Sequence, residues 1–272
     1  MSHPHRPLGF VLAASDYGPL IVNRFDRHIN KDGSGYGVGF EILGTSTYAN
    51  EEVALVTDLL GVRRQHFGDG VVAIDCGANI GVHTIEWAKT MTGWGSVLAI
   101  EAQERIFYAL AGNIAINNCF NARAVHAAVD AESGVLKIPS PDYLRPASFG
   151  SLELKQHQTN EFIGQKIDYS DEATTPVRCL TLDTLGLNRV DLLKIDVEGM
   201  EVETLAGAEN LIKSFSPIIM VEWIKSPKEE IKNVFNRFNY SYFEVGINLL
   251  AIHNSDPTLG HVKSAPPPAA PA

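Results

Sequence analysis

Carboxylates end several short apolar runs in this sequence, and they are the residues whose placement first suggests chemistry. Asp75 follows residues 71–74, Glu101 follows residues 97–100, and Asp196 closes a third run. Uninterrupted apolar runs of this length are typical of strands buried on both faces of a parallel sheet. Ligands bind at the carboxyl ends of such strands. We therefore expect these carboxylates to gather at one edge of a sheet, around a binding site.

A glycine-bearing turn follows the first of these runs and has the sequence Asp-Cys-Gly-Ala-Asn-Ile-Gly over residues 75–81. Glycines let the backbone approach a ligand closely, and the helix that follows offers free N–H donors at its start. The turn therefore predicts a nucleotide-type cofactor. In the dinucleotide fingerprint G-x-G-x-x-G a middle glycine lies beneath the pyrophosphate, and here Asn79 occupies that place. The mismatch speaks against a nicotinamide cofactor.

Apolar strands alternate with helical patterns along most of the chain, and this alternation must position the carboxylates. The expected strands are residues 71–74, 97–100, 124–129, 190–195 and 218–221, and the expected helices are one from about residue 81, 200–215 and 227–238. Residues 242–245 and 249–252 predict a closing hairpin. The pattern predicts an α/β fold: a mostly parallel sheet with helices on both faces and a C-terminal antiparallel hairpin.

The chain divides into three regions by composition. Residues 1–70 predict an N-terminal extension with a hairpin, a glycine-rich loop and a helix that starts at an N-cap Asn50 and stops at Gly61; the loop is a linker or a lid. Residues 71–255 form the α/β domain, which residues 132–176 interrupt as an insertion. Residues 256–272 are a Pro/Ala-rich tail, for which we expect disorder.

Composition excludes several classes of protein. The 272 residues include 22 Lys and Arg against 32 Asp and Glu, a net charge of -10, which argues against a nucleic-acid partner. Three widely spaced cysteines form no CxxC metal pair and fit a reduced compartment. No apolar run is long enough for a signal peptide or a membrane helix. A cytoplasmic protein with a small-molecule partner and no membrane association is the expectation.

Several motifs together resemble the FkbM family of S-adenosylmethionine-dependent methyltransferases. They are the turn at 75–81, the run ending in Glu101, Thr-Leu-Asp at 181–183, Lys-Ile-Asp-Val-Glu-Gly-Met-Glu at 194–201, Ala-Gly-Ala at 206–208 and Val-Glu at 221–222. The resemblance covers roughly residues 71–252, and its most distinctive part is the motif at 194–199. It implies a class I methyltransferase fold, which is a Rossmann-like, seven-stranded sheet, and S-adenosylmethionine as the cofactor.

The resemblance also assigns cofactor-binding residues. It implies that the glycine turn wraps the methionine part of the donor, that Asp75 supports the turn or the donor's amino group, and that Glu101 holds the ribose hydroxyls. Residues at the ends of the second and third strands would border the adenine. The full set is Asp75, Gly77, Ala78, Asn79, Gly81, Glu101, Ala102, Ala128, Val129 and Asp130. His83, on the first turn of the next helix, is either a crevice residue or part of the packing of that helix, and we favour packing.

The catalytic candidates are Asp196, Glu198 and Glu222, at the ends of the fourth and fifth strands. Methyl transfer to an alcohol needs alignment of the acceptor and removal of its proton, and a carboxylate suits that task. Lys194 shares strand alternation with Asp196 and Glu198, so an ion pair is the structural alternative for this trio. No metal is required, although a divalent cation among the three carboxylates is an alternative.

The sequence thus predicts an O-methyltransferase that acts on a hydroxyl of a sugar, glycan or natural product. The alternatives are an NAD(P)-dependent oxidoreductase and a non-catalytic S-adenosylmethionine-binding module. Aromatic residues of the extension and the insertion are expected to wall the acceptor side: Tyr36, Tyr48, Tyr143, Phe149 and Tyr169. The oligomeric state is left open.

Overall fold

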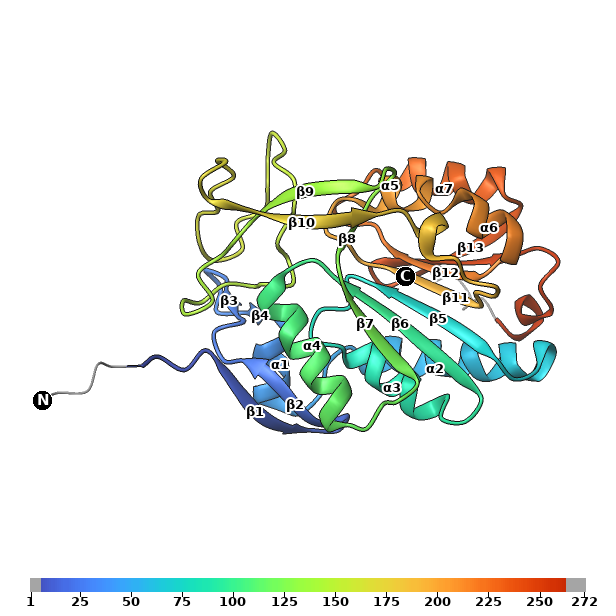
Figure 1. Cartoon of the computed structure of the whole chain (residues 1–272), viewed down its shortest axis with the longest axis horizontal. Helices are drawn as coiled ribbons and strands as arrows, with labels where there is room; N and C mark the ends of the chain where they lie inside the picture. The colour runs from blue at the N-terminus through green and yellow to red at the C-terminus, as the bar shows by residue number, and fades with distance from the viewer. Residues whose placement is uncertain (1–5, 263–272) are drawn as a thin grey trace, which may run out of the picture.

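The computed structural model describes residues 6–262 and is built around one seven-stranded sheet (Figure 1). Its strand order is β13-β14-β12-β11-β5-β6-β7. The bounds are β5 (Val71–Cys76), β6 (Gly95–Glu101), β7 (Ala122–His126), β11 (Leu192–Ile195), β12 (Ile218–Glu222), β13 (Tyr240–Val245) and β14 (Asn248–His253). β14 runs antiparallel to both its neighbours, whereas the other pairs are parallel. This confirms the predicted α/β sheet with its closing hairpin.

Helices cover both faces of this sheet (Figure 1). One layer contains α2 (Asn50–Phe67), α3 (Val82–Thr90) and α4 (Glu104–Ile116), and the other contains α5 (Glu201–Ala206), α6 (Glu209–Phe215) and α7 (Lys228–Arg237). Successive strand residues alternate between the two layers: Ala73 packs on the α2 side, and Ile74 packs on the α6 side. Burial on both faces is the reason these strands are apolar throughout.

The helix α2 is longer than the sequence pattern predicted. It passes through Gly61, where we placed a stop, and ends at Phe67 before Gly68, whose φ is 74°. A glycine inside a helix costs about 1 kcal/mol relative to alanine. Burial of Leu60 and Arg63 on either side of Gly61 supplies packing that outweighs this cost.

Two further boundaries differ from the predicted ones. The predicted strand at 124–129 is two strands, because the chain leaves the main sheet after β7 and β8 (Ala128–Val129) pairs with β10 (Thr174–Leu180). The predicted helix at 200–215 is broken between α5 and α6, and Glu201 rather than Met200 begins it. At the break, a Cβ on Gly207 would lie 2.2 Å from the carbonyl oxygen of Asp130, so this approach requires glycine.

The N-terminal segment and the insertion lie together on one side of the sheet (Figure 1). The segment contains β1 (Phe10–Ser15), β2 (Gly18–Asn23), β3 (His28–Ile29), β4 (Gly35–Tyr36) and α1 (Val38–Thr45). The insertion contains β9 (Gly134–Pro139), which pairs antiparallel with β10. Arg27 N donates to Ala147 O, and Ala147 N donates to Phe25 O, so backbone hydrogen bonds join the two regions.

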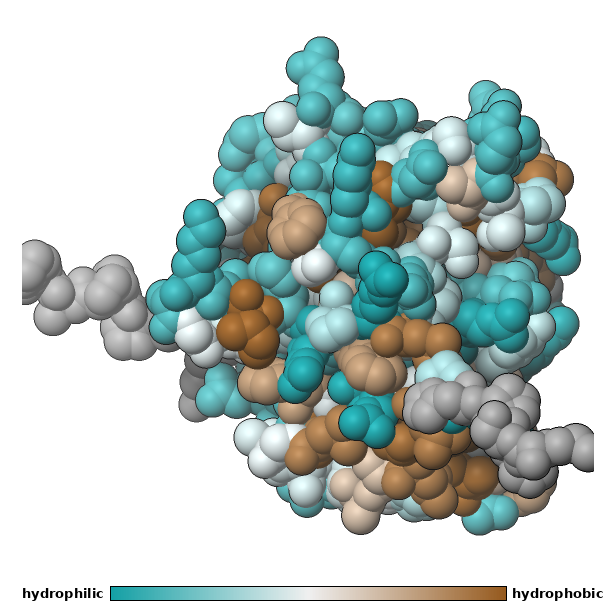
Figure 2. Space-filling model, turned by 90° about the vertical axis from the view of Figure 1, so that its left-hand side faces the viewer, coloured by the Kyte–Doolittle hydropathy of each residue, from teal (hydrophilic) through white to brown (hydrophobic). Residues whose placement is uncertain are grey.

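This side of the molecule carries mixed polar and apolar side chains (Figure 2). Apolar residues gather toward the bottom of the view, at the height where Figure 1 draws β1, β2 and α1. Exposed apolar side chains on these elements include Leu12, Phe40 and Leu43.

The described residues also contain two short 3-10 helices, η1 (Leu182–Leu185) and η2 (Pro257–His261). The second corrects the predicted disordered tail at 256–272, because Asp256 caps η2 and forms a buried ion pair with Arg63 of α2. The Pro/Ala-rich stretch from residue 264 lies outside the described residues.

Candidate active site

A cavity of about 460 Å³ opens at the carboxyl ends of β5, β6, β11 and β12. This volume is within the range of sites that bind small molecules and cofactors. The sheet supplies the strand ends, and the N-terminal segment and the insertion supply other parts of the lining, among them Tyr36, Tyr48 and Ser151. The predicted wall residues Tyr143, Phe149 and Tyr169 do not line it.

The glycine turn after β5 forms one wall of this cavity. Gly77, Asn79 and Gly81 have φ angles of 77°, 49° and 93°, in the left-handed region that favours glycine. A Cβ on Gly77 would lie 1.7 Å from the carbonyl oxygen of Asp196, so no side chain fits there. The amides of Gly77 and Ala78 both donate to Ile100 O, which fixes the turn against β6.

Asp75 lies buried beneath this turn and lines the cavity. Its Oδ2 accepts a hydrogen bond of 2.6 Å from Thr84 Oγ1 on α3. Its Oδ1 is buried and has no hydrogen-bond partner among the described residues. A buried oxygen without a partner is costly, so this atom is a natural contact for a ligand donor.

Glu101 ends β6 and faces the same cavity. Its Oε2 accepts from the amide of Asn79 at 3.0 Å, and its Oε1 accepts from the amide of Gln103 at 2.7 Å. Burial raises the pKa of Glu101 to about 7, although the backbone hydrogen bonds favour the charged form. The residue therefore holds the glycine turn as well as facing the cavity.

Most of the other predicted cofactor residues also line the cavity, including Ala78, Ala102, Ala128 and Val129. Asp130 does not, which corrects its predicted position. Because β8 leaves the main sheet to pair with β10, Asp130 N donates to Leu180 O, and its carboxylate pairs with Lys155 at 2.6 Å.

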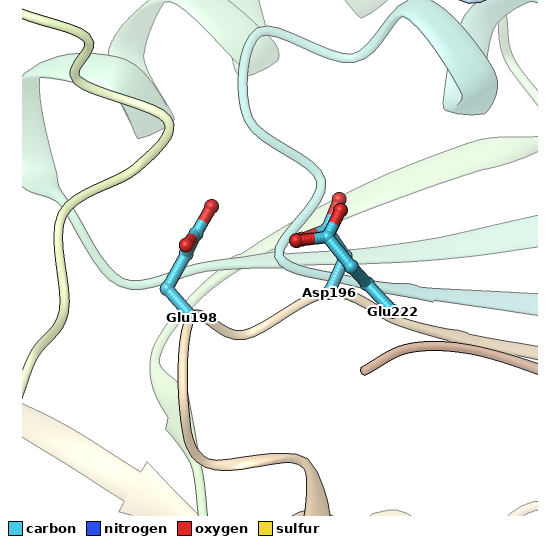
Figure 3. A group of neighbouring side chains, drawn as sticks. All are labelled: Asp196, Glu198 and Glu222. Carbon is cyan, nitrogen blue, oxygen red and sulfur yellow. The ribbon is translucent and has the colours of Figure 1, made fainter. Parts of the chain in front are cut away.

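Asp196, Glu198 and Glu222 form an acidic cluster in the cavity, and each contributes a carboxylate oxygen within 4.8 Å of the others (Figure 3). Asp196 follows β11, Glu222 ends β12, and Glu198 lies on the turn opposite them. Glu198 has a φ of 55°, an unusual conformation for a residue with a side chain. Strained backbone of this kind is a recurring feature of functional sites.

Two lysines neutralise part of this cluster. Lys194 Nζ lies 2.9 Å from Asp196 Oδ2, so the expected ion pair on alternate strand positions is present. Lys225 Nζ lies 2.6 Å from Glu198 Oε2. These ammonium groups contact one oxygen of Asp196 and one oxygen of Glu198, so they offset part of the negative charge that would attract a cation there. A divalent cation among the three carboxylates stays an alternative prediction.

The pKa of Glu222 is raised to about 8. Burial is the main cause, and the negative charge of Asp196 adds to it, against the opposing effect of Lys194. Burial and Asp196 likewise raise the pKa of Glu198 well above its ordinary value. A carboxyl with a pKa near neutral pH can both hold and release a proton under ordinary conditions.

Sequence reasoning missed the pair formed by Glu52 of α2 and His83 of α3. His83 Nε2 lies 3.1 Å from Glu52 Oε1, and both residues line the cavity. Burial would raise the pKa of Glu52, but the contact with His83 and the charge of Lys194 outweigh it and lower the pKa to about 2. His83 also packs edge-on against Trp87, so the predicted packing role describes only part of its position.

The sequence of this chain matches the family model described as "Methyltransferase FkbM domain" over residues 75–246. It is 28% identical over 154 residues to Methyltransferase 1 of Beauveria bassiana (strain ARSEF 2860), covering 53% of this chain and 61% of that protein. It is 26% identical over 156 residues to methyltransferase sdnD of Sordaria araneosa, covering 50% of this chain and 60% of that protein. The chain thus spans about three fifths of the length of these curated relatives.

Solved structures also resemble the chain. The methyltransferase FkbM of Methylobacillus flagellatus KT aligns over 68% of this chain and 43% of its own, with 14% identity and a TM-score of 0.46. Within residues 6–262, no helix is both long enough and apolar enough to cross a membrane.

Proposed function

Because this chain belongs to the FkbM methyltransferase family, whose model covers residues 75–246, we propose that it is an S-adenosylmethionine-dependent O-methyltransferase. The acceptor we propose is a hydroxyl group of a sugar, a glycan or a natural product. One observation carries the proposal: the glycine turn, Asp75, Glu101 and the acidic cluster all face a single cavity.

The residues in this cavity fit the proposed donor. Its positively charged sulfonium and amino groups suit a lining that is rich in carboxylates. The free Oδ1 of Asp75 would accept from the donor's amino group, and Glu101 would accept from the ribose hydroxyls through its remaining lone pairs. Ala102, Ala128 and Val129 would border the adenine.

The donor, when bound, supplies an activated methyl group, and the chain must then manage the acceptor and its proton. We assign the acceptor hydroxyl to the acidic cluster, with Glu222 as the proton acceptor and Asp196 and Glu198 as its partners. The raised pKa of Glu222 makes its carboxylate a stronger base than an ordinary one. Lys194 contacts Asp196 Oδ2 at 2.9 Å and would hold this carboxylate in place.

The domain organisation belongs to the same proposal. Residues 71–255 would be the methyltransferase domain, and residues 1–70, together with the insertion at 132–176, would cover its site. The positions of Tyr36, Tyr48 and Ser151 in the cavity lining support this arrangement. A small-molecule or saccharide acceptor is the expected partner.

Calorimetry with S-adenosylhomocysteine, the demethylated donor, tests the cofactor assignment. We expect one site on the folded chain and no heat with NADH. Absence of binding at millimolar ligand would overturn the proposal. Methyl transfer from labelled S-adenosylmethionine to a panel of hydroxylated acceptors then separates an O-methyltransferase from a module that only binds the donor.

A further inference from the structure

Lys225, in the loop between β12 and α7, has a buried side chain that contacts three different partners. Its Nζ donates to Ser151 O at 2.7 Å, and it lies 2.8 Å from Glu161 Oε2 and 2.6 Å from Glu198 Oε2. Of these three contacts, the one to Ser151 O has hydrogen-bond geometry, and the two carboxylates lie within ion-pair distance. Ser151 and Glu161 belong to the insertion, whereas Glu198 belongs to the acidic cluster.

The same contacts continue into the N-terminal segment. Tyr36 Oη donates a hydrogen bond of 2.7 Å to Glu161 Oε1, the oxygen of that carboxylate that Lys225 leaves free. A continuous polar chain therefore runs from Tyr36 through Glu161 and Lys225 to Glu198. All four residues line the cavity, so the chain joins three separate parts of its wall.

The charge of Lys225 also acts on carboxylates of the acidic cluster. The charged groups that act on Glu222 are Lys194 from β11, Asp196 directly after β11, Glu201 from α5 and Lys225 from the loop after β12. Lys225 favours the ionised form of Glu222, and it also favours the ionised form of Glu198. Loss of the Lys225 charge would therefore disturb the acidic cluster and at the same time weaken the contacts that hold Ser151 and Glu161 over the cavity.

We propose that Lys225 is a positioning residue that couples the cover of the site, made by the N-terminal segment and the insertion, to the acidic cluster. It holds Glu198 in its left-handed backbone conformation while it fastens Ser151 and Glu161 over the cavity. The inference rests on the proposed function for its meaning in catalysis, but the coupling itself is a property of the chain alone.

Hydrogen–deuterium exchange on the full chain tests the coupling without any ligand. In Lys225→Met we expect about tenfold faster amide exchange in residues 148–163, 34–37 and 197–201 together. Residues 148–163 and 197–201 lose a direct contact with Lys225, and residues 34–37 are held through Glu161, which loses its partner. Lys225→Arg keeps the charge and should restore most of the protection. Tyr36→Phe should affect the N-terminal segment and leave residues 197–201 unchanged.

Lys228→Met is the matched control, because Lys228 pairs with Glu244 at 2.7 Å and neither residue is part of the cavity lining. Unchanged exchange in Lys225→Met, or exchange that rises equally in the arginine variant, would overturn the proposal. Calorimetry with S-adenosylhomocysteine on the wild-type chain is a separate measurement. Its failure would remove the proposed function while the exchange result still decided the coupling.

Discussion

The backbone amide of Asn79 donates to Oε2 of Glu101 over 3.0 Å and so joins the glycine turn after β5 to the end of β6. Asn79 adopts a φ of 49° there, and its own Oδ1 accepts from the amide of Ile80. The turn and the carboxylate are therefore one unit, and a change in Glu101 acts on both.

Glu101→Ala should weaken the binding of S-adenosylhomocysteine by about 10- to 100-fold, since hydrogen bonds to a charged group are worth about 1.5–3 kcal/mol. Calorimetry measures the effect. Glu104→Ala is the control, because Glu104 is an exposed residue at the start of α4 whose carboxylate contacts Tyr108. An affinity within twofold of wild type in Glu101→Ala would show that the carboxylate does not contact the donor.

Gly77→Ala should lower the thermal midpoint strongly and abolish donor binding, because the new Cβ would collide with the carbonyl of Asp196. Gly93→Ala is the control that measures the cost of the backbone conformation alone. Gly93 has a similar φ of 82°, but a Cβ there would meet open space. We expect Gly93→Ala to cost only about 1–2 kcal/mol. Equal losses in the two variants would contradict the close approach at Gly77.

Glu222→Gln should reduce kcat by about 10²- to 10⁴-fold, the usual contribution of a general base. The affinity for S-adenosylhomocysteine should stay within about threefold, because the group acts on the acceptor. In the wild type, kcat/KM should rise with pH through about 8, as Glu222 ionises. Steady-state kinetics with an acceptor from the panel gives both results, and a flat pH profile would exclude Glu222 as the base.

The raised pKa of Glu222 also predicts a pH dependence of stability. The folded chain binds this proton more tightly than the unfolded chain, whose carboxyl has its ordinary pKa of 4.5. Stability should therefore fall as the pH rises from about 4.5 to about 8. Glutamine cannot ionise, so the midpoint of Glu222→Gln should exceed that of the wild type by several degrees near pH 8 and match it near pH 4.5. If the midpoints of the wild type and of Glu222→Gln changed with pH in the same way, Glu222 would not have the raised pKa.

Arg63→Met should destabilise the fold by about 3–5 kcal/mol, because it leaves the buried carboxylate of Asp256 without its ion-pair partner and leaves Asp191 paired with Arg189 alone. Arg64→Met is the adjacent control: its ion pair with Asp69 is exposed and should be worth about 0–1 kcal/mol. Urea denaturation compares the two variants. Similar losses would mean that Arg63 does not anchor α2 to the sheet.

The parallel sheet could be predicted from the sequence because both of its faces are buried, so each strand is a continuous apolar run. The need for glycine at the break, Gly207, could not, because it comes from a carbonyl of Asp130 more than seventy residues earlier in the chain. The helix α2 shows the opposite case. Its local sequence predicts an end at Gly61, but packing against the sheet stabilises the helix as far as Phe67.

The candidate site was predictable where residues follow strands directly, as Asp75, Glu101 and Asp196 do. Glu52 and Lys225 gave no comparable signal. Glu52 looks like an ordinary acidic residue in a first helical turn, and Lys225 lies in a short loop between a strand and a helix. Both residues line the cavity only because distant segments of the chain pack together, and the spacing of residues in the sequence does not predict such packing.

The pairing of β9 with β10 bears on how the length of the insertion can vary. Pro139 and Thr174 are register partners, so the long connection between them starts and ends at the same point of the fold. Residues 140–173 therefore leave and rejoin the fold at one point, so a change in their length need not alter the register of β9 and β10. The parts of the segment that pack in the core, such as Phe149 and Ile163, would have to be kept.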